Sequence, residues 1–248
     1  MNVVYILWLR ELKKYVRSRA QIVASLGTPL MYLAVLGFGL GPVFRQAGRG
    51  SYMQFMAPGV IGMTVLFTAM FSGIAMLWDR QFGFLKETLV APVPRVQIMI
   101  GRTLGGASVA VLQGTIIFAV TLLAGFRPAS VSAVLVAFLI ISLIAIVFSA
   151  LASAIGSSLK EMAGFQMVMN FLVMPMWYLS GALYPLQDLP TALAVLTRLD
   201  PLTYGIDGVR GTMIGQTHFG LSLDVGVLLG VGVLFVLAGA WRFSKIEV

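Results

Sequence analysis

The sequence predicts an all-α integral membrane protein with six transmembrane helices. The chain has 248 residues, of which 59% are hydrophobic and only 10% are charged. An average soluble domain carries about 25% charged residues, which help to cover its surface. The apolar residues also fall into six uncharged runs, and a helix needs roughly 20 such residues to cross a bilayer.

The six predicted spans form a single transmembrane domain over residues 1–248. They cover residues 22–44, 55–78, 98–126, 132–156, 162–184 and 221–242. Pro29 and Pro175 are expected to kink the first and fifth spans, because proline removes a helical hydrogen bond. Small residues four positions apart are expected to let helices approach closely. They are Gly37 and Gly41, Gly101 and Gly105, Gly226 and Gly230, and Ser149, Ser153 and Ser157.

Residues 1–20 predict an amphipathic helix at the membrane interface, ahead of the first span. On a helical wheel its aromatic residues Tyr5, Trp8 and Tyr15 share one face with Leu12 and Val16. The opposite face carries Arg10, Lys13, Lys14 and Arg17. Such a helix binds anionic lipid, alone or together with a contact to a partner. Because no small-residue cleavage signal follows, we expect a retained anchor rather than a signal peptide.

Residues 185–220 are expected to stay outside the bilayer as an external re-entrant helical hairpin or as interfacial helices. A span over this part would contain Arg198, Asp200, Asp207 and Arg210, and each charge costs about 2.5–3.5 kcal/mol near the bilayer centre. Asp200 is expected to start a helix as its N-cap, with proline at the first helical position.

Basic residues predict the orientation. With both termini inside, the inner segments contain 12 of the 17 Lys and Arg residues. Cytoplasmic segments are enriched in these residues. We therefore expect a multi-pass protein of the plasma membrane with cytoplasmic N- and C-termini.

Composition also disfavours several functions. The chain has no cysteine and one histidine, His218, so it offers neither a thiol nucleophile nor a metal-ligand cluster. The net charge of +8 reflects topology rather than a nucleic-acid partner, because the basic residues lie beside apolar runs. None of the lysines follows the glycine-rich pattern that binds nucleotide phosphates. We expect no catalytic residue, metal or cofactor in this chain.

Residues 79–95 predict a short amphipathic helix in the cytoplasm between two spans. Phe82 lies on an apolar side with two leucines, and Arg80 and Glu87 lie opposite. Two prolines then end the helix. It is expected either to lie on lipid or to dock a cytoplasmic protein.

Four stretches, in this order, resemble motifs of the membrane subunit of bacterial and archaeal type-2 ATP-binding-cassette exporters, the group that includes drug-resistance permeases and glycan exporters. They are SYMQFMAPGVIGM (51–63), FGFLKETLVAPVPR (82–95), LSGALYPLQDLP (179–190) and LDPLTYGIDGVRG (199–211). The resemblance covers essentially the whole chain. It implies a dimer of such chains, here expected to be a homodimer, that binds two copies of an ATPase subunit carrying ATP and Mg²⁺.

The resemblance also implies that residues 79–95 contain the coupling helix that sits on the ATPase. The coupling residues carried over are Arg80, Phe82, Gly83, Phe84, Lys86 and Glu87, with a second, smaller contact at Lys160 and Glu161. A substrate path along the dimer interface is expected to use the first, second and fifth spans. Its candidate lining residues are Gln113, Asn170, Phe171 and Trp177. Gln113 and Asn170 have a second interpretation as hydrogen-bonding groups between helices.

The expected function is ATP-driven export of a hydrophobic drug, a lipid or a lipid-linked glycan. The alternatives are a secondary transporter or channel without an ATPase, and a membrane scaffold protein. The predicted spans carry no charge near their middle, whereas ion-coupled transporters usually keep ionisable groups there.

Overall fold

The structure is a computed structural model that describes residues 3–46, 51–82, 93–159, 161–187 and 189–244. All regular elements in these ranges are helical. They are α1 (Val3–Arg17), α2 (Arg19–Gln46), α3 (Tyr52–Gln81), α5 (Arg95–Leu123), α6 (Val131–Ser158), α7 (Met162–Val168), the π-helix η1 (Met169–Val173), α8 (Met174–Leu179), α9 (Thr191–Leu199), α10 (Pro201–Ile214) and α11 (Leu221–Ser244).

Six stretches of the described residues are long and apolar enough to cross a membrane, which confirms the predicted number of spans. They are Arg19–Phe44, Tyr52–Gln81, Arg95–Leu123, Val131–Ser158, Met162–Leu179 and Leu221–Phe243. Helix α3 continues to Gln81 and α5 already begins at Arg95. The membrane helices therefore reach further into the predicted 79–95 segment than the hydropathy pattern indicated.

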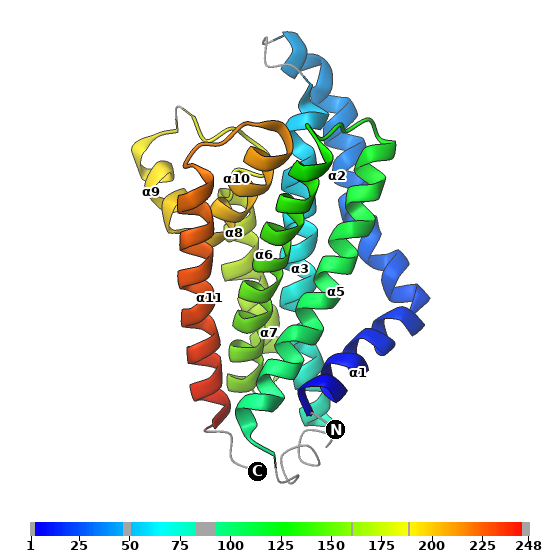
Figure 1. Cartoon of the computed structure of the whole chain (residues 1–248), viewed down its shortest axis with the longest axis vertical. Coiled ribbons are helices and arrows are strands. Elements are labelled where there is room, and N and C mark those ends of the chain that lie inside the picture. Colours follow the sequence, from blue (N-terminus) through cyan, green and yellow to red (C-terminus); the bar gives the residue numbers. More distant parts are fainter. Residues whose placement is uncertain (1–2, 47–50, 83–92, 160, 188, 245–248) are drawn as a thin grey trace.

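Helices α3 and α6 form the centre of the bundle (Figure 1). Of the 18 most apolar consecutive residues in each span, 67% are buried in α3, against 17% in both α2 and α11. Two glycines let α3 and α6 meet: a Cβ atom on Gly73 would lie 2.6 Å from the carbonyl oxygen of Ala152, and one on Gly156 would lie 2.8 Å from that of Gly73. The close backbone contact makes α3 and α6 a central pair, and the other helices pack around this pair.

Different helices close the two ends of the bundle. Helices α9 and α10 lie at the end that is uppermost in Figure 1, whereas α1 lies at the opposite end, together with the start of α5 and the end of α11. Asp200 caps α10, because its side chain accepts a hydrogen bond from Leu202 N, and Pro201 is the first helical residue. This confirms the predicted start of the helix.

Helix α1 presents a different face to the protein than its apolar residues suggest. It packs against α5, burying Leu7 and Tyr15, while Tyr5 and Val16 are exposed. Glycines on α5 allow this contact, since a Cβ on Gly101 would lie 3.0 Å from Leu7 Cβ. A helical wheel shows which side chains of α1 are apolar. It does not show which of them are buried, because that depends on where α5 packs.

The fifth span is irregular, as its proline predicts. Helix α7 passes into the five-residue π-helix η1, and α8 then starts with Pro175 in its first turn. Proline has no backbone N–H to donate, and the π-helical turn before it changes the hydrogen-bond spacing from i+4 to i+5. The first span, in contrast, remains one helix through Pro29 and Pro42.

Candidate functional site

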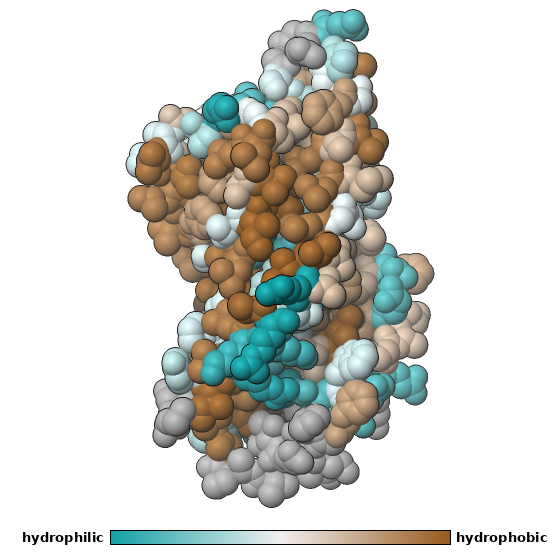
Figure 2. All heavy atoms as spheres, turned by 90° about the vertical axis from the view of Figure 1, so that its right-hand side faces the viewer, coloured by the Kyte–Doolittle hydropathy of each residue, from teal (hydrophilic) through white to brown (hydrophobic). Residues whose placement is uncertain are grey.

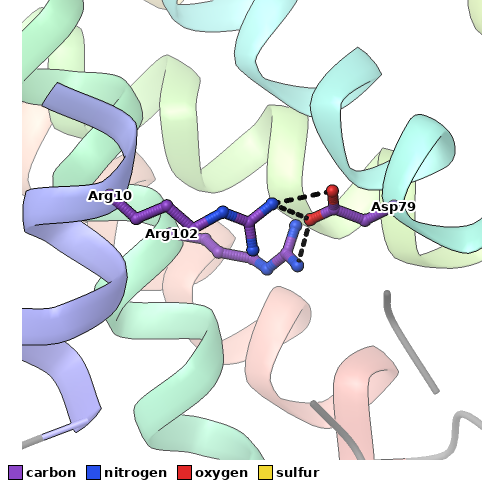
Figure 3. Close-up of polar contacts among 3 residues, drawn as sticks. All are labelled: Arg10, Asp79 and Arg102. Carbon is purple, nitrogen blue, oxygen red and sulfur yellow. Dashed lines mark hydrogen bonds and ion pairs between the residues drawn. The ribbon is translucent and has the colours of Figure 1, made fainter. Parts of the chain in front are cut away.

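A buried ion-pair cluster joins three helices where α3 ends (Figure 3). Asp79 of α3 accepts two hydrogen bonds from Arg10 Nη2 of α1, at 2.8 and 2.9 Å, and one from Arg102 Nη2 of α5 at 2.6 Å. The Asp79 and Arg102 side chains are 7% and 8% exposed, and that of Arg10 is 38% exposed. A buried carboxylate is stable only when it is paired, so this cluster holds the three helices in one arrangement.

The position of Asp79 explains why it needs two cationic partners. It lies in the last turn of α3, where the helix dipole disfavours a negative charge. Arg10 approaches from α1 and Arg102 from α5, and each offers a guanidinium that matches the geometry of a carboxylate. The cluster thus stabilises a helix end that would otherwise be electrostatically unfavourable.

The next residue ties the same helix end to α6. Arg80 Nη1 donates a hydrogen bond of 2.7 Å to the carbonyl oxygen of Leu159, the C-cap residue of α6. Phe82 follows, largely exposed, with its ring 5.7 Å from that of Trp78. The end of α3 is therefore linked to α1, α5 and α6 at once.

Several predicted coupling residues lie outside the described residues: Gly83, Phe84, Lys86, Glu87 and Lys160. Glu161 is described, and it is the exposed residue that precedes α7. Arg80 and Phe82 were predicted within a separate coupling helix over 79–95, but Arg80 belongs to the last turn of α3 and Phe82 is its C-cap, because α3 continues to Gln81.

Two of the four predicted path residues lie inside the chain. Gln113 of α5 is fully buried and accepts a hydrogen bond from the Tyr15 hydroxyl of α1. Trp177 of α8 is 2% exposed and packs against the rings of Tyr32 and Phe67. In this conformation Gln113 connects helices, which matches the second interpretation given to it.

The other two predicted path residues are on the outside of the fifth span. Asn170 and Phe171 belong to η1 and both are exposed, Phe171 to 79%. Gln166 Nε2 lies 3.5 Å from Asn170 Oδ1, so two amide side chains occupy this face. π-Helical turns occur frequently at functional sites.

The buried charges of the 185–220 segment, Asp200, Asp207 and Arg210, have hydrogen-bond partners within the protein. Arg210 donates to the carbonyl oxygens of Gly181 at 2.9 Å and Phe55 at 3.4 Å, and its guanidinium lies 4.1 Å from the Phe55 ring centroid. Burial lowers the pKa of Arg210 to about 10, against the opposing effect of Asp207. Arg210 remains cationic at neutral pH and anchors α10 to α3.

Asp207 organises the turn that leads into α11. Its carboxylate accepts hydrogen bonds from the backbone N–H groups of His218 and Phe219 and from the Thr217 hydroxyl. Arg210 and Asp207 also line an open cavity of about 680 Å³ at this end of the bundle. Among the described residues, no group of three or more His, Cys, Asp or Glu side chains is placed to hold a metal ion.

Residues 2–214 match the family model described as "ABC-2 type transporter". The chain belongs to this family. It is 30% identical to the inner membrane transport permease YadH of Escherichia coli K12 over 233 residues, which are 93% of this chain and 90% of that protein. It is also 30% identical to nodulation protein J of Rhizobium leguminosarum bv. viciae over 211 residues, which are 84% and 81% of the two chains. The ABC-2 permease is thus a multi-pass inner-membrane protein of a transport family.

Sequence reasoning missed the Asp79 cluster of the permease. It assigned Arg10 to the exposed basic face of α1 and used Arg102 only as a charge that sets orientation. One signal was available, because Asp79 is the first acidic residue after Glu11 and stands at the end of a long apolar run. A lone carboxylate at that place indicates a basic partner from another helix.

Proposed function

We propose that this permease is the transmembrane subunit of an ATP-driven exporter, which works as a homodimer and is driven by two copies of a separate ATPase chain. The observation that carries the proposal is the buried cluster of Asp79, Arg10 and Arg102. It fixes Asp79, the first residue of the segment 79–95 in which the coupling helix is predicted, to α1 and α5.

A rigid junction is what mechanical coupling requires. A loop that only reversed the chain direction would need no fixed connection to several helices. Here Asp79 links α3 to α1 and α5, and Arg80 links it to the end of α6. A push on the segment after Phe82 would therefore move four helices together, and ATP binding would shift the balance between two arrangements of the bundle.

The same assignment places this junction, both termini and α1 on the cytoplasmic side. The distribution of Lys and Arg residues supports that orientation. The helices α9 and α10 would then form the external re-entrant hairpin.

Exposed polar groups on the fifth span support a path at a dimer interface. An amide facing lipid tails has no water to bond, so such groups are rare on lipid-facing surfaces. Gln166 and Asn170 both lie on one side of α7 and η1. We propose that this side faces the partner protomer or the substrate path. The uncharged spans suit a hydrophobic drug, a lipid or a lipid-linked glycan.

The test is gentle extraction of the tagged permease from its native membrane, followed by mass spectrometry of the proteins that accompany it. We expect an ATP-binding-cassette ATPase at about one copy per permease chain. A permease dimer that comes out intact with no ATPase would overturn the proposal and favour a secondary transporter or a scaffold.

A further inference from the structure

A lateral cavity lies where α1 turns into α2. Its volume is about 460 Å³, it is open on one side, and residues of α1, α2, α3 and α5 line it. This volume falls within the range of about 300–1,000 Å³ that is typical of ligand sites. Most of its lining surface is apolar and includes Ala24, Phe71, Ile74 and Val109. A cavity with such walls accepts a hydrocarbon group.

The cavity crosses the level at which lipid headgroups meet acyl chains. Lys14 lines it and belongs to α1, five residues before the first candidate span begins at Arg19. Ala24 also lines it and belongs to the first turns of that span. With α1 at the membrane surface, as its amphipathic pattern predicts, we infer that Lys14 lies at headgroup depth and Ala24 within the hydrocarbon layer.

Charge complementarity identifies the headgroup. Figure 2 shows hydrophilic surface at the level of α1, below a largely hydrophobic surface. Helix α1 contributes Lys13, Lys14 and Arg17 there, against one acidic residue, Glu11, while the charge of Arg10 is paired with Asp79. Each unpaired basic residue near the membrane surface adds about 1 kcal/mol of attraction to anionic lipid. Glu11 also lines the cavity, so we assign the phosphate to the Lys14 side.

We propose that this cavity binds one acidic phospholipid, with an acyl chain between α2 and α3 and its phosphate at Lys14. Such a lipid would fix the angle between α1 and α2. The proposal concerns a site in the single chain, so it stands whether or not an ATPase drives the permease.

The test compares neighbouring residues that share charge or exposure but differ in whether they line the cavity. The purified permease in mild detergent is titrated with phosphatidylglycerol, phosphatidylethanolamine or phosphatidylcholine, and bound lipid is counted by native mass spectrometry. Lys14→Gln removes a cavity charge, whereas Lys13→Gln removes an exposed charge outside the cavity. Ala24→Phe fills the cavity, whereas Val23→Phe adds the same ring on the exposed surface beside it.

We expect the first phosphatidylglycerol to bind more tightly than either zwitterionic lipid. Lys14→Gln should weaken it by about fivefold, the effect of one basic residue near an anionic lipid surface, and Lys13→Gln by less. Ala24→Phe should abolish the first binding event, and Val23→Phe should leave it intact. Thermal unfolding confirms that each variant is folded.

Three results would overturn the proposal. Equal effects of Lys13→Gln and Lys14→Gln, with no effect of Ala24→Phe, would mean diffuse electrostatic attraction without a built site. Tighter binding of phosphatidylethanolamine would contradict the assigned headgroup. Full competition by soluble glycerol phosphate would show that no acyl chain contributes.

Discussion

The carboxylate of Asp79 lies 2.6 Å from Nη2 of Arg102, and both side chains are buried. Breaking such a pair by removing one partner leaves a buried charge without compensation, which typically destabilises a protein by about 3–5 kcal/mol. Because Arg10 also bonds to Asp79, loss of this one carboxylate leaves two cations facing each other.

Asp79→Asn should therefore lower the free energy of unfolding by about 3–5 kcal/mol. Arg10→Gln should cost about 1 kcal/mol or less, because Arg10 is 38% exposed and water screens its charge. Unfolding in detergent micelles measures both. Glu161→Gln, which removes an exposed carboxylate, is the control, and an equal effect of Asp79→Asn and Glu161→Gln would refute the structural role of the cluster.

Gly73→Ala should disrupt the crossing of α3 and α6. The added Cβ would meet the Ala152 carbonyl oxygen at 2.6 Å, and overpacking of this kind typically costs about 1–3 kcal/mol. Gly226→Ala is the matched control, since a Cβ there has no described atom within 4 Å. It should be neutral or stabilising, because alanine favours the helix. Thermal unfolding of both variants decides, and a stable Gly73→Ala variant would contradict the close approach.

Asp200 should make the stability of the protein depend on pH. Burial raises the pKa of this carboxyl to about 7, against the lowering effect of hydrogen bonds from Leu202 N and the Thr203 hydroxyl. The unfolded chain has the ordinary pKa near 4, so between about pH 4 and 7 the folded state binds the extra proton. Stability from this group is present below pH 4 and is lost as pH rises through 7.

Asp200→Asn should remove this pH dependence while keeping the helix cap, because asparagine caps a helix as well as aspartate does. The measurement is the free energy of unfolding of both proteins from pH 4 to 8. The difference between them should change over this range by an amount on the order of a few kcal/mol. Parallel curves would mean that Asp200 does not titrate in this window.

Asn170 tests the proposed path. Asn170→Leu should reduce transport while leaving the unfolding midpoint nearly unchanged, because the side chain is exposed in the single chain. Thr115→Val is a control on α5, since the Thr115 hydroxyl is also exposed but bonds to Val111 O of its own helix. Transport assays in liposomes compare the two, and normal transport by Asn170→Leu would place this face against lipid.

Features that depend on local sequence could be predicted, whereas those that depend on distant partners could not. The number of spans follows from apolar runs, and the start of α10 follows from the Asp200-Pro201 pair alone. The Asp79 cluster joins residues 69 and 23 positions apart. No periodicity within one helix reports such a contact.

Small residues illustrate the same limit. Gly101 and Gly105 do allow close approach, here to α1, but Gly226 and Gly230 meet no described atom within 4 Å. The contact of Gly73 with the α6 backbone, at Ala152 O, lies outside every pair that the four-residue spacing selected. Four-residue spacing identifies helix faces made of small residues. Which of these faces contacts another helix depends on the fold.

The most direct test of the account is cross-linking between residue 87 and the ATPase. The chain contains no cysteine, so Glu87→Cys introduces the only reactive thiol of the chain, and Gln216→Cys does the same at the end of the bundle that contains α10. With a short cross-linker in native membranes, we expect a product between Glu87→Cys and an ATP-binding subunit and none from Gln216→Cys. An ATPase captured only at Gln216→Cys, or none at Glu87→Cys in an intact dimer, would contradict it.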